Sequence, residues 1–102
     1  MTFHAYRLVP PRPTFAQDMT DQEAAVMAEH AQYWQELVDR GTAVAFGPVA
    51  DPAGVWGLAL IEVDSDDEAA AIRDHDPAVV RGVARGEMHP MLGATLRAAQ
   101  RA

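Results

Sequence analysis

The stretch WGLALIEVDSDDE, residues 56–68, decides the fold, because the longest apolar run of the chain here meets the start of a helix. Residues Trp56 to Val63 predict a strand, and the unbroken run from Leu58 to Ile61 is typical of a central strand covered on both faces. A shorter β-rich run, Thr42 to Phe46, precedes it, and the turn residues Asp51 to Gly54 lie between them. These segments predict a hairpin.

The second half of the same stretch begins a helix. Ser65-Asp66-Asp67-Glu68 forms a capping box, and its acids favour the positive end of the helix dipole. We expect the helix to run from Asp66 to about His75, because the residue before a proline, here Asp76 in Asp76-Pro77, leaves helical geometry. A further turn opened by Pro77 should end near Gly82, and Val83 to Met91 predicts a last, weak strand.

The N-terminal part of the chain adds one strand and one longer helix. Phe3 to Val9 alternates like a strand, and the prolines that follow predict an irregular loop from Pro10 to Met19. Thr20-Asp21-Gln22-Glu23 is a second capping box, so a helix should run from Asp21 to Arg40. Gly41 suits the left-handed conformation that ends such a helix.

The order strand, helix, strand, strand, helix, strand predicts an α+β fold. It is the ferredoxin-like βαββαβ plan, in which two helices cover one face of an antiparallel sheet. We expect one domain over residues 1–102, with a short C-terminal helix from Gly93 to Ala102. The uncovered face of the sheet makes a homodimer the expected assembly.

Composition narrows the possible functions. The 102 residues include no Cys, no Lys and a single Ser, which excludes thiolate and Schiff-base chemistry and disfavours a Ser-His-Asp triad. A net charge of −7 without any basic run argues against nucleic-acid partners and anionic membranes. No apolar stretch is long enough to cross a bilayer and no signal peptide is recognisable, so we expect a cytoplasmic protein.

One titratable residue lies on the apolar stripe of the longer predicted helix. His30 belongs to two neighbouring ridges, Val26-His30-Tyr33-Leu37 and Met27-His30-Trp34-Val38. A histidine there is either a core residue satisfied by a hydrogen bond or a functional group. Because most nucleophiles are missing from the chain, acid–base chemistry by His and carboxylates is the main remaining catalytic route. In the predicted topology, Asp76 at the end of the second helix can approach His30.

These segments together resemble the YCII-related domain (YciI-like) family. The matching residues run through nearly the whole chain: Glu29-His30-Ala31-Gln32-Tyr33-Trp34, Gly41, Gly47-Pro48, Asp51, Gly54, Gly57, Ser65 to Ala69 and Asp76-Pro77. The resemblance implies a dimeric α/β barrel with a pocket at a His-Asp pair, here His30 and Asp76. The resemblance also implies that family members act as acid–base enzymes. One member type is a dehydrochlorinase of a chlorinated hydroxyhydroquinone, although most members have no assigned reaction. The chain departs from the family pattern at Ala78 and Met91, where aromatic residues are common, which argues against a stacking platform.

Further side chains are candidates for substrate binding. They are Arg7, Tyr33, Trp34, Gly47, Pro48 and His75. For the aromatic residues the plain alternative is core packing, and for Arg7 it is an exposed strand position. His30, His75, Asp76 and His89 are the candidate ligands of a metal site. No HxH, HxxxH or HExxH spacing in the sequence supports such a site, so we expect neither a metal nor another cofactor. The Pro-rich segment 10–13 is a candidate cover for the pocket mouth.

The main functional hypothesis is a small enzyme in which His30, oriented by Asp76, performs an elimination or isomerisation on a small organic substrate. Two alternatives use the same fold. In the first, the protein binds a small molecule in the pocket and catalyses no reaction. In the second, the protein is a dimeric interaction scaffold whose pocket is vestigial. A more distant alternative is the related group of cofactor-free monooxygenases.

Overall fold

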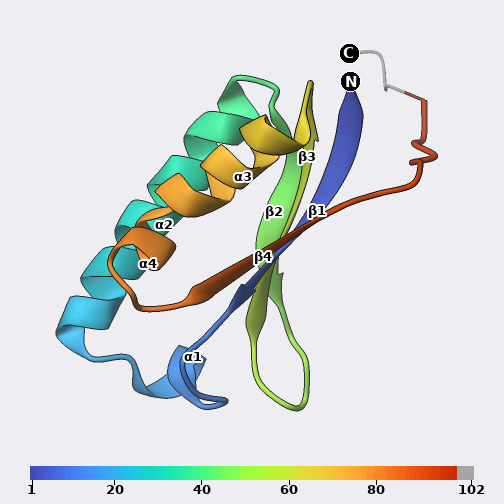
Figure 1. Ribbon diagram of the computed structural model, residues 1–102. Coiled ribbons are helices and arrows are strands. Elements are labelled where there is room, and N and C mark those ends of the chain that lie inside the picture. The colour runs from blue at the N-terminus through green and yellow to red at the C-terminus, as the bar shows by residue number, and fades with distance from the viewer. Residues whose placement is uncertain (99–102) are drawn as a thin grey trace.

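The computed structural model describes residues 1–98 and shows a four-stranded antiparallel sheet with its helices on one side (Figure 1). The order of the main elements is the predicted ferredoxin-like βαββαβ order. The elements are β1 (Thr2–Val9), α1 (Phe15–Asp18), α2 (Asp21–Asp39), β2 (Ala43–Val49), β3 (Trp56–Val63), α3 (Asp66–His75), α4 (Pro77–Val80) and β4 (Arg85–Pro90).

The strand order in the sheet is β2-β3-β1-β4, so β1 and β3 are the central strands. Tyr6 pairs with Ala59 on β3 and with Met88 on β4. Alternation along β1 directs His4, Tyr6 and Leu8 to the helix side, where all three are buried. The central position predicted for Trp56–Val63 is therefore confirmed.

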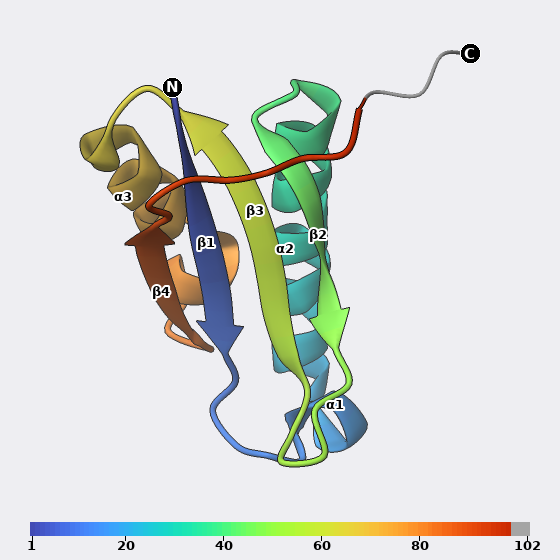
Figure 2. The same ribbon diagram turned by 90° about the vertical axis from the view of Figure 1, so that its right-hand side faces the viewer.

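The helices α2 and α3 cover one face of the sheet, and Figure 2 shows the other face, which carries no helix and is crossed near one end by the segment that follows β4. The core lies under the helices, where Trp34 and Leu37 of α2 pack against Tyr6 and Ile61. Leu58 of β3 has 44% of its surface exposed. The prediction that β3 is covered on both faces is thus wrong within a single chain.

Both predicted helix starts are confirmed, but only the one at Thr20 is a complete capping box. There the Thr20 hydroxyl accepts from the Glu23 amide, and the Glu23 carboxylate accepts from the Thr20 amide. At α3 the Ser65 hydroxyl accepts from the Glu68 amide, whereas the Glu68 carboxylate accepts from the Asp64 amide. Gly41 has a φ of 80°, the left-handed value predicted for the residue that follows α2. The local start and stop signals of α2 and α3 are therefore reliable.

Two predictions, one for the segment after β1 and one for the segment after β4, need correction. The segment predicted as an irregular loop contains α1, which Arg12 stabilises by ion pairs with Asp18 and Glu23. No helix forms over residues 93–98; Leu92 and Leu96 stay exposed there, so an apolar helix face would have nothing to pack against. The rest of the predicted C-terminal helix, residues 99–102, lies outside the described residues. Among the described helices, none is long and apolar enough to span a membrane.

Candidate functional site

The imidazole of His30 and the carboxylate of Asp76 form the centre of the candidate site. His30 lies on α2, and Asp76 lies at the junction of α3 and α4. The His30 Nδ1 atom is 2.9 Å from Asp76 Oδ1 and 3.0 Å from Oδ2. The structure therefore brings together two residues that are 46 positions apart.

Asp76 is fully buried, with 0% of its surface exposed, and its carboxylate accepts from four donors. Besides His30 Nδ1, these are the Tyr6 hydroxyl at 2.9 Å, Trp34 Nε1 at 2.8 Å and the Ala78 amide at 2.9 Å. Burial alone would raise the pKa of Asp76, but the hydrogen bonds from His30 and Trp34 outweigh it and hold the pKa below its ordinary value. Asp76 is thus a permanent carboxylate at neutral pH.

The charge of Asp76 determines which ring nitrogen of His30 is free. A carboxylate only accepts hydrogen bonds, so Nδ1 must carry the proton, and in the neutral imidazole Nε2 is the unprotonated nitrogen. Nε2 has no hydrogen-bond partner among residues 1–98, and it is not sealed in the core. The arrangement leaves one basic nitrogen accessible beside a buried anion.

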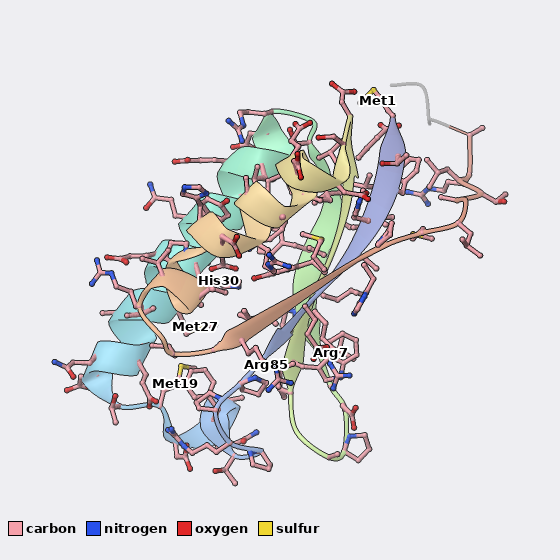
Figure 3. The ribbon with its side chains drawn as sticks, in the orientation of Figure 1. Met1, Arg7, Met19, Met27, His30 and Arg85 are labelled. Atoms are coloured by element: carbon pink, nitrogen blue, oxygen red, sulfur yellow. The ribbon has the colours of Figure 1, made fainter. Side chains whose placement is uncertain are left out.

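An apolar cavity of about 280 Å³ lies beside His30, between α2 and the sheet. Of the predicted substrate-binding residues, Trp34, Gly47 and Pro48 line it. His30 and Met27 lie on α2 and Met19 lies between α1 and α2, so the three follow one another toward α1 (Figure 3), and all three contribute to the wall. The Pro-rich segment reaches the cavity through Pro10, and α1 adds Phe15 and Ala16.

Three predicted substrate-binding residues lie elsewhere. Arg7 is exposed on the open face of the sheet, where its guanidinium lies 4.7 Å from the centre of the Trp56 ring. The Tyr33 hydroxyl donates to the Ile72 carbonyl at 2.8 Å, and the pKa of Tyr33 is raised to about 12 by burial and by the Asp76 charge. His75 is exposed, with Nδ1 2.7 Å from the Ala71 carbonyl. None of these side chains lines the cavity.

The sequence reasoning missed Tyr6 and Gly86. Burial and the neighbouring Asp76 carboxylate raise the pKa of Tyr6 well above its ordinary value, so its hydroxyl is a permanent donor. A Cβ atom at position 86 would lie 2.8 Å from the Tyr6 hydroxyl oxygen and 2.9 Å from Arg73 Cγ. Glycine is therefore required where β4 passes the site. The available signal was that Tyr6 faces the core, where a tyrosine hydroxyl needs a partner.

No group of three or more His, Cys, Asp or Glu side chains within residues 1–98 is arranged to hold a metal ion. His30 and Asp76 are bonded to each other, and His75 and His89 do not join them. The four-residue metal site drawn from the sequence is therefore not assembled in this part of the chain.

A family model for the YCII-related domain matches residues 5–91, a span that contains Tyr6, His30 and Asp76. The chain belongs to the YCII-related domain family. The resemblance inferred from the sequence is thereby confirmed. No curated protein matches the sequence of this YCII-related protein.

A solved structure resembles this YCII-related protein in fold. It is 5-chloro-2-hydroxyhydroquinone dehydrochlorinase from Burkholderia phenoliruptrix, in complex with 2,5-dihydroxybenzoquinone. The TM-score is 0.60 at 21% sequence identity, and the match covers 87% of this chain and 91% of the other. The likeness supports the ferredoxin-like α+β assignment.

Proposed function

We propose that this protein is a small acid–base enzyme in which His30 Nε2 abstracts a proton from a small organic substrate. One observation carries the proposal: Nδ1 is bound to a buried carboxylate while Nε2 stays free beside a cavity. An imidazole oriented in this way has a defined tautomer and a stabilising anion behind it. Asp76 is the orienting residue, and its four donors hold it in place.

The geometry supports the following chemistry. Nε2 takes a proton from a substrate carbon, and the electrons of the broken C–H bond form a C=C bond. In an elimination, a leaving group on the adjacent carbon departs with its bonding electrons. In an isomerisation, the imidazolium returns the proton to a different carbon. Throughout, the Asp76 charge stabilises the imidazolium that forms.

The dehydrochlorinase with the similar fold supports this reaction class. Loss of hydrogen chloride is an elimination, and it needs a base. At 21% identity the neighbour's substrate belongs to that protein alone. We therefore carry over the type of chemistry and leave its substrate aside.

A proton-transfer assay tests the proposal without knowledge of the natural substrate. Cyclohex-3-enone serves as the probe, because a base converts it to the conjugated enone through an exchangeable carbon acid. In D₂O the wild-type protein should accelerate both isomerisation and deuterium incorporation. His30→Gln and Asp76→Asn should each lower the rate by at least about 100-fold, while His75→Gln, which alters an exposed histidine, should leave it unchanged.

Three outcomes would count against this proposal. They are no acceleration by the wild type, equal rates for the wild type and His30→Gln, or loss of rate in His75→Gln. Circular dichroism and thermal melting of each variant show whether a lost rate reflects lost folding. Probe binding without any proton exchange would favour the binding module over the enzyme.

We also infer that two copies associate through the open face of the sheet. Leu58 and Val44 are 44% and 49% exposed, and Leu92 and Leu96 follow β4 with their side chains in solvent. Apolar side chains gathered on one uncovered sheet face are typical of an interface. The open face seen in Figure 2 supports a homodimer of this chain.

A further inference from the structure

We propose that the cavity beside His30 selects an uncharged, largely apolar molecule and rejects carboxylates and phosphates of the same shape. The inference deepens the proposed function, since it names the class of substrate for the same site. It rests on which polar groups of the cavity wall are still available.

Among residues 1–98, the side chains that form the wall carry no charge apart from His30 when it is protonated. They include no Arg, Lys, Asp, Glu, Ser, Thr, Asn or Gln, and most are aliphatic, aromatic or methionine side chains. Arg12, which lies 5.3 Å from the centre of the Phe15 ring near the cavity, is occupied by Asp18 and Glu23. An anion in the cavity would therefore lose its hydration without gaining a fixed cation.

The few polar side-chain groups on the wall are already engaged. The Tyr6 hydroxyl and Trp34 Nε1 both donate to Asp76, at 2.9 and 2.8 Å. Trp56 Nε1 donates to Asp51 at 3.1 Å. Of the side-chain nitrogens that the described residues place on the wall, only His30 Nε2 remains, and in the neutral ring it is an acceptor. A bound molecule thus finds one side-chain hydrogen-bond partner, and that partner is the proposed base.

The buried Asp76 carboxylate adds to the selection. It lies directly behind the His30 ring, 2.9 Å from Nδ1, and its negative charge disfavours a second anion in the same apolar surroundings. Size sets the other limit, because an apolar cavity of about 150 Å³ holds benzene. The cavity of about 280 Å³ has room for a substituted ring or a small fused bicycle.

Acetophenone and benzoate test the inference, because they have nearly the same shape and differ by one charge. Binding is followed at neutral pH by NMR shifts of backbone amides around the cavity, with Ala31 and Ala59 as reporters. Acetophenone should bind, and benzoate should bind at least about 30-fold more weakly. His30→Ala should keep this preference, because the apolar wall remains.

A gain-of-binding variant provides the positive control. Ala16 is exposed on α1 and lines the cavity, so Ala16→Arg places a guanidinium at the wall without disturbing the core. This variant should raise the affinity for benzoate at least about tenfold, and the neutral Ala16→Gln should not.

The inference is overturned if wild type binds benzoate as tightly as acetophenone, if neither probe binds, or if Ala16→Gln improves benzoate binding as much as Ala16→Arg. Its failure is separable from failure of the proposed function. Selective binding without proton exchange rejects only the catalytic role of His30, whereas proton exchange on an anionic substrate rejects only the selectivity.

Discussion

The Tyr6 hydroxyl donates a 2.9 Å hydrogen bond to Asp76, which lies 70 positions away in the chain. This contact joins the central strand β1 to the junction of α3 and α4. It also supplies one of the four donors that keep a buried carboxylate charged. The site is therefore coupled to the core of the sheet as well as to α2.

Removing the Tyr6 hydroxyl should lower the stability of the protein. Tyr6→Phe removes a hydrogen bond to a buried charge and should lower the free energy of unfolding by about 1.5–3 kcal/mol. The matched control is Tyr33→Phe, whose hydroxyl donates to the neutral Ile72 carbonyl and should cost only about 0.5–1.5 kcal/mol. Urea denaturation measures both, and equal losses in the two variants would contradict the role assigned to Tyr6.

The lowered pKa of Asp76 predicts a dependence of stability on acid. Between the lowered folded pKa and the ordinary value of 3.8, the unfolded chain binds more protons at this residue than the folded chain does. The stability contributed by Asp76 is therefore present above pH 3.8 and is lost as the pH falls through the folded pKa. Asp76→Asn should be less stable than wild type at neutral pH, and the difference should shrink below pH 3.8.

Exposed Asp74 supplies the comparison for this titration. Its pKa is also lowered, by its ion pair with Arg73, but that pair lies in solvent. Asp74→Asn should track the wild-type acid profile closely. Denaturation curves at several pH values test the prediction, which is wrong if the Asp76→Asn difference stays constant with pH.

The close approach of β4 to Tyr6 predicts that Gly86 tolerates no side chain. Gly86→Ala places a Cβ 2.8 Å from the Tyr6 hydroxyl oxygen, so Tyr6 must shift off Asp76. The substitution should cost about 1–3 kcal/mol of stability and slow the proton-transfer assay. Gly93→Ala, which meets no atom within 4 Å, should leave both measurements at wild-type values. A fully active Gly86→Ala protein would show that the Tyr6 contact is dispensable.

The open face of the sheet predicts a substitution that separates subunits. Leu60 pairs with Ala5 at the centre of this face, so Leu60→Glu places a charge in the inferred interface. It should convert the dimer to a monomer in light scattering coupled to gel filtration. Val80→Glu, at a 62% exposed position on α4, should leave the mass unchanged. A monomeric wild-type protein would refute the homodimer directly.

Local signals in the sequence predicted the helices well. The capping box at Thr20 and the glycine after α2 involve atoms within a few residues of each other, so their partners are readable from the sequence. The pairing of His30 with Asp76 also followed from the topology and the family resemblance. The short helix α1 was missed because Arg12 contacts it through Asp18, six positions away, while the same guanidinium binds Glu23 of α2, eleven positions away.

The residues that line the cavity were the least predictable part of the structure. Arg7, Tyr33 and His75 have suitable chemistry, yet each faces away from the cavity, since strand alternation and helix rotation decide the direction of a side chain. Tyr6 lies next to Arg7 and points the opposite way. Residue type alone could not separate these two neighbours.

The sequence by itself determined the order of the elements, the ends of α2 and α3, the central position of β3 and the available catalytic chemistry. These follow from periodicity, capping and composition, which act over a few residues or over the chain as a whole. Only the tertiary structure decided that Tyr6 and Trp34 join His30 at Asp76 and donate their polar hydrogens to its carboxylate. That convergence depends on sheet register and helix packing, and within residues 1–98 it leaves His30 Nε2 without a hydrogen-bond partner beside an apolar cavity.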